Sequence, residues 1–200
     1  SVQFLHEDMQ LSCRELVYDI ENKLVHYFSR ARFVDGEKTL ESNVGTYSSN
    51  TGRLYAGGNV IIVEGMDFIA SDSIAIDKEN KFIQIFKRTH MDINGSLINC
   101  SRGEFDGNTE EGWFAGDASV YDNQGYLAGD SIVVAREDGE GAAWGNVVIR
   151  DSSKTLTVTG VHANRSNDIE LIYGDSLTPA IATNIEEGDT LILGADMLSK

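Results

Sequence analysis

The sequence has little of several residue types and patterns, and each shortage argues against a class of protein. One proline in 200 residues argues against a long disordered linker. No run approaches the roughly 18 consecutive apolar residues of a transmembrane helix, so the sequence predicts none. Lysine and arginine number 16 against 32 aspartate and glutamate residues. Nucleic acids and anionic membrane surfaces bind cationic faces, so we expect neither as a partner.

Cysteine is also scarce. Cys13 and Cys100 occupy the same place in two copies of the repeat described below, three copies apart. Strands stack about 4.8 Å apart, which puts these two Cα atoms at least roughly 14 Å apart. A disulfide bond needs Cα atoms within about 7 Å. We therefore expect two small buried thiols, which do not indicate a cellular compartment.

What the sequence does contain is a repeat of 29 residues. Its successive copies open at Leu11, Leu40, Ile69, Ile98, Leu127 and Leu156, each 29 residues after the one before. A seventh opening, Leu191, comes 35 residues after the sixth. A fixed period of this length is typical of stacked repeats, so we expect one elongated domain over residues 1–200.

The ends of the chain carry two further expectations. Ser1–Phe4 shows no basic segment followed by an apolar one, so we expect a chain without a secretory signal peptide or a processed form. The seventh copy stops in mid-strand at Lys200, and we expect the natural chain to continue.

Each copy has the pattern of two β-strands joined by turns rich in Asp, Asn and Gly. In the second strand, apolar residues such as Ala56, Val60 and Ile62 share one parity, which predicts a face turned inward. In the first strand the apolar parity changes midway, which predicts a bulge or bend. No segment has a sustained helical period. The sequence predicts an all-β fold, an elongated two-walled stack of sheets of the β-jellyroll or solenoid kind.

Glycine recurs at one place in the second half of the repeat, followed by Asn or Asp. Four copies have this pair: Gly58-Asn59, Gly116-Asp117, Gly145-Asn146 and Gly174-Asp175. The glycine shares the inward parity. We therefore expect its missing side chain to leave space in the interior.

These motifs resemble the OstA-like family, which includes periplasmic lipopolysaccharide-transport proteins of the LptA type. The segments that carry the resemblance are Tyr55–Val60, Ile69–Asp77, Leu127–Ser131 and Trp144–Val147. The resemblance implies a β-jellyroll, open along one side, whose facing sheets hold the acyl chains of lipopolysaccharide or another acylated glycolipid. It further implies a non-enzymatic periplasmic component of Gram-negative outer-membrane assembly. Such a component assembles end to end with homologous domains, as a homo-oligomer or with other transport proteins, to bridge inner and outer membranes.

The inward columns are the candidate lipid-binding site. The candidate residues are Leu16, Tyr18, Phe33, Ile62, Ile74, Ile76, Met91, Phe105, Val120, Ile132, Val134 and Ile149. The alternative is that they form a closed structural core, as in most β-solenoids. The protein would then be a structural repeat protein of the filament or adhesin kind.

Signals for catalysis or metal binding are poor, and we predict no catalytic residue, metal ligand or cofactor. The four histidines share no ligand-like spacing. Turn carboxylates such as Asp19 and Asp77 could hold Ca²⁺, but the glycine-rich nonapeptide of calcium-binding β-rolls is absent. A β-helix enzyme acting on polysaccharide stays open as a third hypothesis. It would need acidic and basic side chains converging in one cleft, which the columns do not display.

Overall fold

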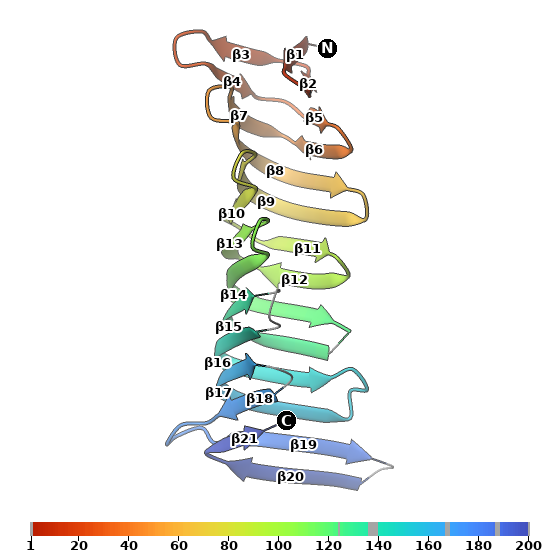
Figure 1. The fold of residues 1–200 in the computed structure, drawn as a ribbon, viewed down its shortest axis with the longest axis vertical. Helices are drawn as coiled ribbons and strands as arrows, with labels where there is room; N and C mark the ends of the chain where they lie inside the picture. The colour runs from red at the N-terminus through yellow and green to blue at the C-terminus, as the bar shows by residue number, and fades with distance from the viewer. Residues whose placement is uncertain (1, 124, 136–139, 167–168, 187–188, 200) are drawn as a thin grey trace. The chain divides into compact units, whose positions relative to one another are not determined.

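The computed structural model describes residues 2–123, 125–135, 140–166, 169–186 and 189–199. These residues form two compact units, drawn in Figure 1. Unit 1 contains residues 1–95 and 102–108, and unit 2 contains residues 96–101 and 109–200. Both are built from antiparallel strands, which confirms the predicted all-β fold class. That residues 1–200 make a single domain stays a prediction. Over the described ranges, no helix is long and apolar enough to cross a membrane.

Unit 1 has two walls that share its two longest strands, β8 (Arg53–Glu64) and β9 (Asp67–Asp77). The first wall adds β3 (Leu16–Asp19), β4 (Leu24–Tyr27), β7 (Val44–Ser48), β10 (Phe82–Ile85) and β13 (Arg102–Asp106). The second wall adds β1 (Val2–His6), β2 (Met9–Cys13), β5 (Ala31–Asp35), β6 (Lys38–Ser42) and β11 (Thr89–Ile93).

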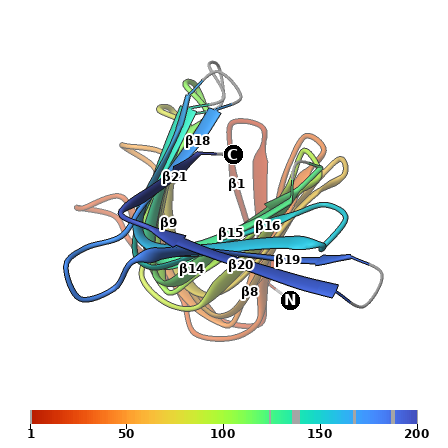
Figure 2. The same ribbon diagram turned by 90° about the horizontal axis from the view of Figure 1, so that it is seen from below.

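Unit 2 repeats this plan with four strands that run through both walls. These are β14 (Glu111–Asp122), β15 (Gly125–Ala135), β16 (Glu140–Asp151) and β17 (Leu156–Ser166). The first wall adds β18 (Ile169–Tyr173) and β21 (Met197–Ser199), and the second adds β12 (Ser96–Cys100), β19 (Ala180–Glu186) and β20 (Asp189–Ala195). Figure 2 shows β18 and β21 in one arm of this unit and β19 and β20 in the other.

The bend between the walls lies at three of the four Gly-Asn and Gly-Asp pairs; the fourth, Gly174-Asp175, lies between β18 and β19, where the strand breaks. At Gly58 and Asn59 both φ angles are positive, at 71° and 51°, and the pairing of β8 with β9 shifts there. The pairs at 116–117 and 145–146 have the same signs. Glycine is needed because this left-handed conformation is costly for residues with a Cβ atom. The expectation that it leaves space inside was wrong, since Gly58 is exposed at the bend.

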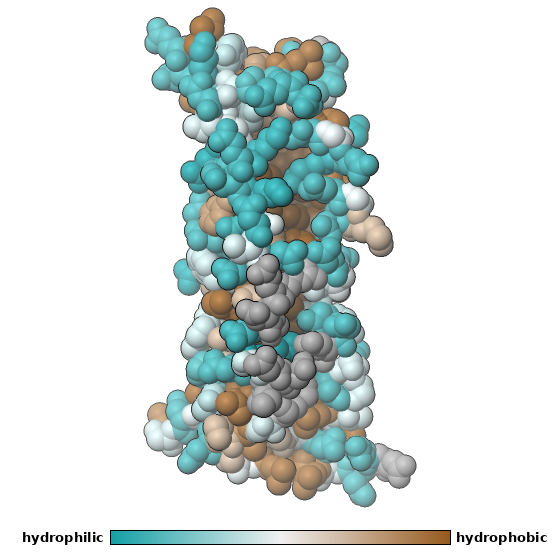
Figure 3. All heavy atoms as spheres, in the orientation of Figure 1, coloured by the Kyte–Doolittle hydropathy of each residue, from teal (hydrophilic) through white to brown (hydrophobic). Residues whose placement is uncertain are grey.

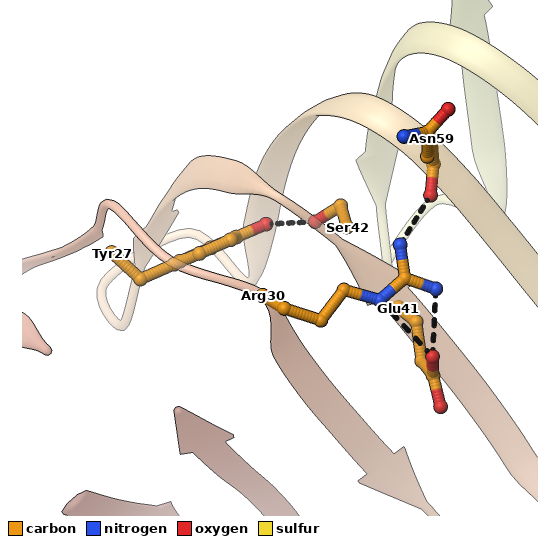
Figure 4. A network of polar contacts seen from close by, with 5 residues as sticks. All are labelled: Tyr27, Arg30, Glu41, Ser42 and Asn59. Atoms are coloured by element: carbon orange, nitrogen blue, oxygen red, sulfur yellow. Dashed lines mark hydrogen bonds and ion pairs between the residues drawn. The ribbon is translucent and has the colours of Figure 1, made fainter. Parts of the chain in front are cut away.

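Where the repeat lacks this pair, the strand breaks at the same place. β4 ends at Tyr27 and β5 begins at Ala31, on either side of Ser29-Arg30. Arg30 lies at the break, donates to the backbone oxygen of Asn59 at 2.9 Å and pairs with Glu41 at 2.7 Å, as Figure 4 shows. A side chain of one copy thus contacts the bend of the next.

Residues 29 apart lie on common ladders inside each unit. In unit 1 the ladder runs through Leu11, Phe33, Leu40, Ile62, Ile69 and Met91. In unit 2 it runs through Ile98, Val120, Leu127, Ile149, Val158, Ala182 and Leu193.

The ladder of unit 2 departs from the sequence period at its end. It passes through Val158 and Leu193, two positions beyond the openings expected at Leu156 and Leu191. The turn between β16 and β17 explains the displacement, because it spans residues 152–155 where the turn between β8 and β9 spans only 65–66. Two extra turn residues move every later partner by two positions, which keeps the same face inward.

Candidate functional site

The inner face of the first wall in unit 1 is built from two apolar columns. The column next to the bend consists of Leu16, Tyr27, Gly45, Ala56, Ile74, Ile85 and Gly103. The column next to the rim, the edge of the wall away from the bend, consists of Tyr18, Val25, Tyr47, Leu54, Ile76, Ile83 and Phe105. Because side chains alternate between the faces of a strand, both columns point to the same side of the wall.

The inner faces of the two walls of unit 1 meet. Tyr27 of the first wall packs edge-on against Phe33 of the second, with ring centroids 5.4 Å apart. Phe4 of β1 lies 5.6 Å from the ring of Tyr18 and 6.4 Å from that of Tyr47. Aromatic pairs at these distances stabilise the contact beyond their buried area. The interior therefore includes packed side chains from both walls.

Most side chains of both columns in unit 1 are buried. Ile74, next to the bend, has no exposed surface, and in the rim column Val25 has none and Ile76 is 9% exposed. Phe105 in the rim column is half-buried, and Tyr18 is 39% exposed. Figure 3 shows hydrophobic atoms in a hollow between hydrophilic edges on one face of unit 1. The interior of unit 1 is thus closed along most of the rim column and more exposed at Tyr18 and Phe105.

Unit 2 has the same inner columns over most of its length. The column next to the bend of the first wall runs through Phe114, Ile132, Ala143, Ala163, Ile172 and Leu198. Phe114 and Ile132 have no exposed surface, whereas Val134 in the rim column is half-buried. In unit 2 these side chains are therefore less buried in the rim column than next to the bend.

An ion pair interrupts the rim column of unit 2. The column runs through Gly112, Val134, Gly141, Arg165 and Glu170. The guanidinium of Arg165 donates to the carboxylate of Glu170, whose side chain is only 11% exposed. The sequence analysis missed this pair. Alternation in the second half of β17 offers the signal, because Arg165 lies two positions after the inward-facing Ala163.

Hydroxyl groups are bonded within the interior of unit 1. The hydroxyl oxygens of Tyr27 and Ser42 lie 2.5 Å apart (Figure 4), and those of Ser71 and Thr89 lie 2.7 Å apart. Burial raises the pKa of Tyr27 to about 12, so its hydroxyl is neutral at physiological pH. In each pair one hydroxyl donates and the other accepts, which removes most of the cost of burying them.

The turn carboxylates considered as calcium ligands accept hydrogen bonds from residues of their own turns. Asp19 accepts hydrogen bonds from the side chain and backbone of Asn22, and Asp77 accepts the same pair from Asn80. In each turn the asparagine side chain makes the largest contribution to lowering the pKa of the aspartate. In the described part of the chain, no three His, Cys, Asp or Glu side chains are grouped so that they could hold a metal ion.

All twelve predicted lipid-binding residues lie on inner columns. Those of unit 1 are Leu16, Tyr18, Phe33, Ile62, Ile74, Ile76, Met91 and Phe105, and those of unit 2 are Val120, Ile132, Val134 and Ile149. The prediction omitted Val25, Leu54 and Ile83, which share the rim column of unit 1. These three residues recur 29 residues apart, so the repeat itself holds the signal that could have found them. That the twelve residues bind lipid stays a prediction.

Each unit thus has the architecture of a β-jellyroll with an apolar interior between two walls. Residues 1–72, which lie within unit 1, match the family model described as OstA-like protein. This match confirms the OstA-like resemblance for the N-terminal part of the chain. No curated protein matches the chain.

Proposed function

We propose that the chain binds the acyl chains of lipopolysaccharide, or of another acylated glycolipid, between its walls, as a non-enzymatic component of lipopolysaccharide transport in the periplasm. The observation that carries this proposal is the continuous apolar inner face between the two walls. This face is partly exposed at Tyr18 and Phe105 of unit 1 and at Val134 of unit 2. The OstA-like match of residues 1–72 supports the same class of ligand.

The energetics favour tail burial with the head group outside. Burying a fourteen-carbon chain at about 0.8 kcal/mol per methylene gives on the order of 10 kcal/mol before entropic costs. The chain carries a net charge of −16, which repels lipid phosphates. That repulsion is screened over about 8 Å at physiological ionic strength and costs far less if the head group stays in water.

The contacts between the walls set a condition on binding. A tail that enters unit 1 has to replace or displace contacts such as Tyr27 with Phe33 and Phe4 with Tyr18. The acyl chain offers the same apolar environment that the displaced rings lose. Entry is therefore compatible with the fold when the walls separate toward the rims.

Adjacent residues on opposite faces provide the test. Ile62 faces inward and is 3% exposed, whereas Ile61 faces outward and is 37% exposed. Ile132 and Val133 form the same kind of pair in unit 2, at 0% and 40%. Ile62→Asp and Ile132→Asp should lower the amount of acylated glycolipid that co-purifies, measured by lipid mass spectrometry. Ile61→Asp and Val133→Asp should leave it unchanged.

Folding has to be separated from binding in this test. Circular dichroism and thermal melts select the variants that keep the fold, and Ile132→Phe fills interior space without introducing a charge. Equal lipid recovery from inward and outward variants that remain folded contradicts the proposal. Absence of acylated lipid from every sample favours the structural-repeat alternative, which full burial of Ile74 and Phe114 also supports.

End-to-end assembly with homologous β-domains is the second part of the proposal. β20 carries Leu191, Ile192 and Leu193, all more than half exposed. Among the described strands, β20 pairs with β19. An apolar edge strand is a template for pairing with another sheet. Ile192→Lys should reduce the molar mass that light scattering measures at high protein concentration, and an unchanged mass contradicts this route of assembly.

A further inference from the structure

Two polar side-chain contacts connect the walls of unit 1 on the side away from the bend. Lys78 follows the rim end of β9 in the first wall, and its Nζ lies 2.8 Å from Oδ2 of Asp35 at the rim end of β5 in the second wall. His6, at the rim end of β1 in the second wall, places Nδ1 3.1 Å from the hydroxyl of Tyr47 on β7 in the first wall.

These contacts lie directly over the apolar interior. Tyr47 belongs to the rim column, and its ring also packs against that of His6 with centroids 5.9 Å apart. Burial raises the pKa of Tyr47, and the charges that act on it are Lys78, Glu7, Asp35 and Glu79. The rims of both walls therefore converge on one small polar cluster.

The bridge is of a kind that can open. The side chains of Lys78 and Asp35 are 44% and 28% exposed, so water and salt screen their attraction. The hydrogen bond to Asp35 is the main cause that raises the pKa of Lys78, which keeps the ammonium charged. The contacts nearer the bend, Tyr27 with Phe33 and with Ser42, are shielded from water, so the exposed rim contacts are the weaker of the two sets.

We propose that Asp35–Lys78 and His6–Tyr47 form a strap that closes the open side of unit 1 and parts to admit an acyl chain laterally between the rims. This inference rests on the proposed function, because it names the place of entry to the same interior. The strap then limits the rate of uptake and has little effect on the position of the bound tail.

A second ion pair provides a matched control. Lys38 Nζ lies 2.9 Å from Oε2 of Glu64, and the two side chains are 36% and 57% exposed, but β6 and the end of β8 belong to the same wall. Lys78→Met and Lys38→Met each remove one ion pair and keep most of the apolar stem. Removal of Lys78 deletes an ion pair between the two walls, whereas removal of Lys38 deletes an ion pair within one wall.

The experiment follows uptake of a fluorescent long-chain fatty acid by stopped flow. Lys78→Met should take up the probe about two- to fivefold faster than the unaltered chain, the range that an exposed ion pair spans. Lys38→Met should match the unaltered chain. Raising the salt from about 0.05 M to about 0.5 M should accelerate the unaltered chain more than Lys78→Met, because salt weakens the strap only where it exists. Equal rates and equal salt dependence overturn the strap.

A reversible cross-link gives a second measurement. Asp35→Cys with Lys78→Cys, in a background of Cys13→Ser and Cys100→Ser, is joined by a short bis-methanethiosulfonate reagent. Linked protein should take up the probe far more slowly, and reduction should restore the rate. Uptake at the unlinked rate overturns lateral entry while leaving acyl binding intact. Failure of the unaltered chain to bind either the probe or an acylated glycolipid overturns the proposed function and the strap together.

Discussion

Tyr27 and Ser42 face each other from opposite walls of unit 1, with their hydroxyl oxygens 2.5 Å apart and no exposed surface on Ser42 or Tyr27. Gly45 stands between Tyr27 and Ala56 on the same ladder. A Cβ atom at Gly45 would lie 2.2 Å from the Tyr27 hydroxyl. The missing side chain thus admits the tyrosine ring, and the ring carries a hydroxyl group across to the second wall.

Removing this hydroxyl group should destabilise the fold. Tyr27→Phe leaves the buried Ser42 hydroxyl without its partner, which should lower the free energy of unfolding by about 1–3 kcal/mol. Chemical denaturation measures the change. Ser12→Ala is the control, because the Ser12 hydroxyl donates to the backbone oxygen of Arg32 at the surface, where water replaces the lost partner. Equal losses in the two variants contradict the role given to the buried pair.

Alkaline pH should weaken the fold through the same residue. The pKa of Tyr27 rises from 10.0 to about 12 in the folded state, so the folded chain holds its proton more tightly than the unfolded chain. This contribution is complete below pH 10 and is lost as the pH rises through about 12. Its full size is about 2–3 kcal/mol.

Unfolding midpoints in denaturant at several pH values between 9 and 11.5 test this dependence. Tyr27→Phe should show a shallower decline than the unaltered chain. Tyr47→Phe should remove a further part, since burial raises that pKa too. Parallel declines of Tyr27→Phe and the unaltered chain count against burial of the phenol as the cause.

The space at Gly45 gives a third prediction. Gly45→Ala should cost about 3 kcal/mol or more, because its Cβ would also lie 2.3 Å from the backbone oxygen of Tyr55, which cannot turn away. Gly57→Ala is matched to it on the neighbouring strand, where the nearest atom to the new Cβ is 3.4 Å away on Val44. Thermal melts should show a large loss for the first variant and little change for the second.

The ion pair inside unit 2 gives a fourth. Glu170→Ala leaves the Arg165 guanidinium facing inward without its carboxylate, which should cost about 2–4 kcal/mol, discounted for the one-third exposure of Arg165. Arg165→Met combined with Glu170→Leu should recover most of that loss, because an apolar pair of similar volume needs no partner. If the double variant is as unstable as the single one, the pair is held by contacts other than its charges.

The sequence period predicted the ladders because stacking one copy on the next places residues 29 apart on the same face. The parity change within the repeat predicted the bend because side chains alternate along a regular strand, so a change of parity marks a local irregularity of the backbone. The expectation of interior space at Gly58, Gly116 and Gly145 was wrong because these residues have positive φ, which parity alone does not predict. The longer turn at 152–155 gave no signal in the sequence, because Leu156 keeps the 29-residue spacing, and it follows only from the register of β17.

Contacts between the walls could not be predicted from the sequence. Asp35 and Lys78, like Tyr27 and Ser42, approach each other only because the bend sets the angle between the walls. The repeat determines which side chains point inward and leaves open how far apart the facing columns stand. The inward direction of Arg165, in contrast, follows from alternation along β17 and could have been predicted.

The bends at Gly58-Asn59, Gly116-Asp117 and Gly145-Asn146 are each complete within a single copy, since the two left-handed residues are adjacent in the chain. The cross-section of the interior is therefore encoded locally, and the number of copies governs only its length. Excising residues 40–68 from unit 1 would join the ladder position of Leu11 and Phe33 to that of Ile69 and leave a shorter trough of the same width. Each copy removed would shorten the interior by the same amount, so a series of such deletions would give interiors of graded length.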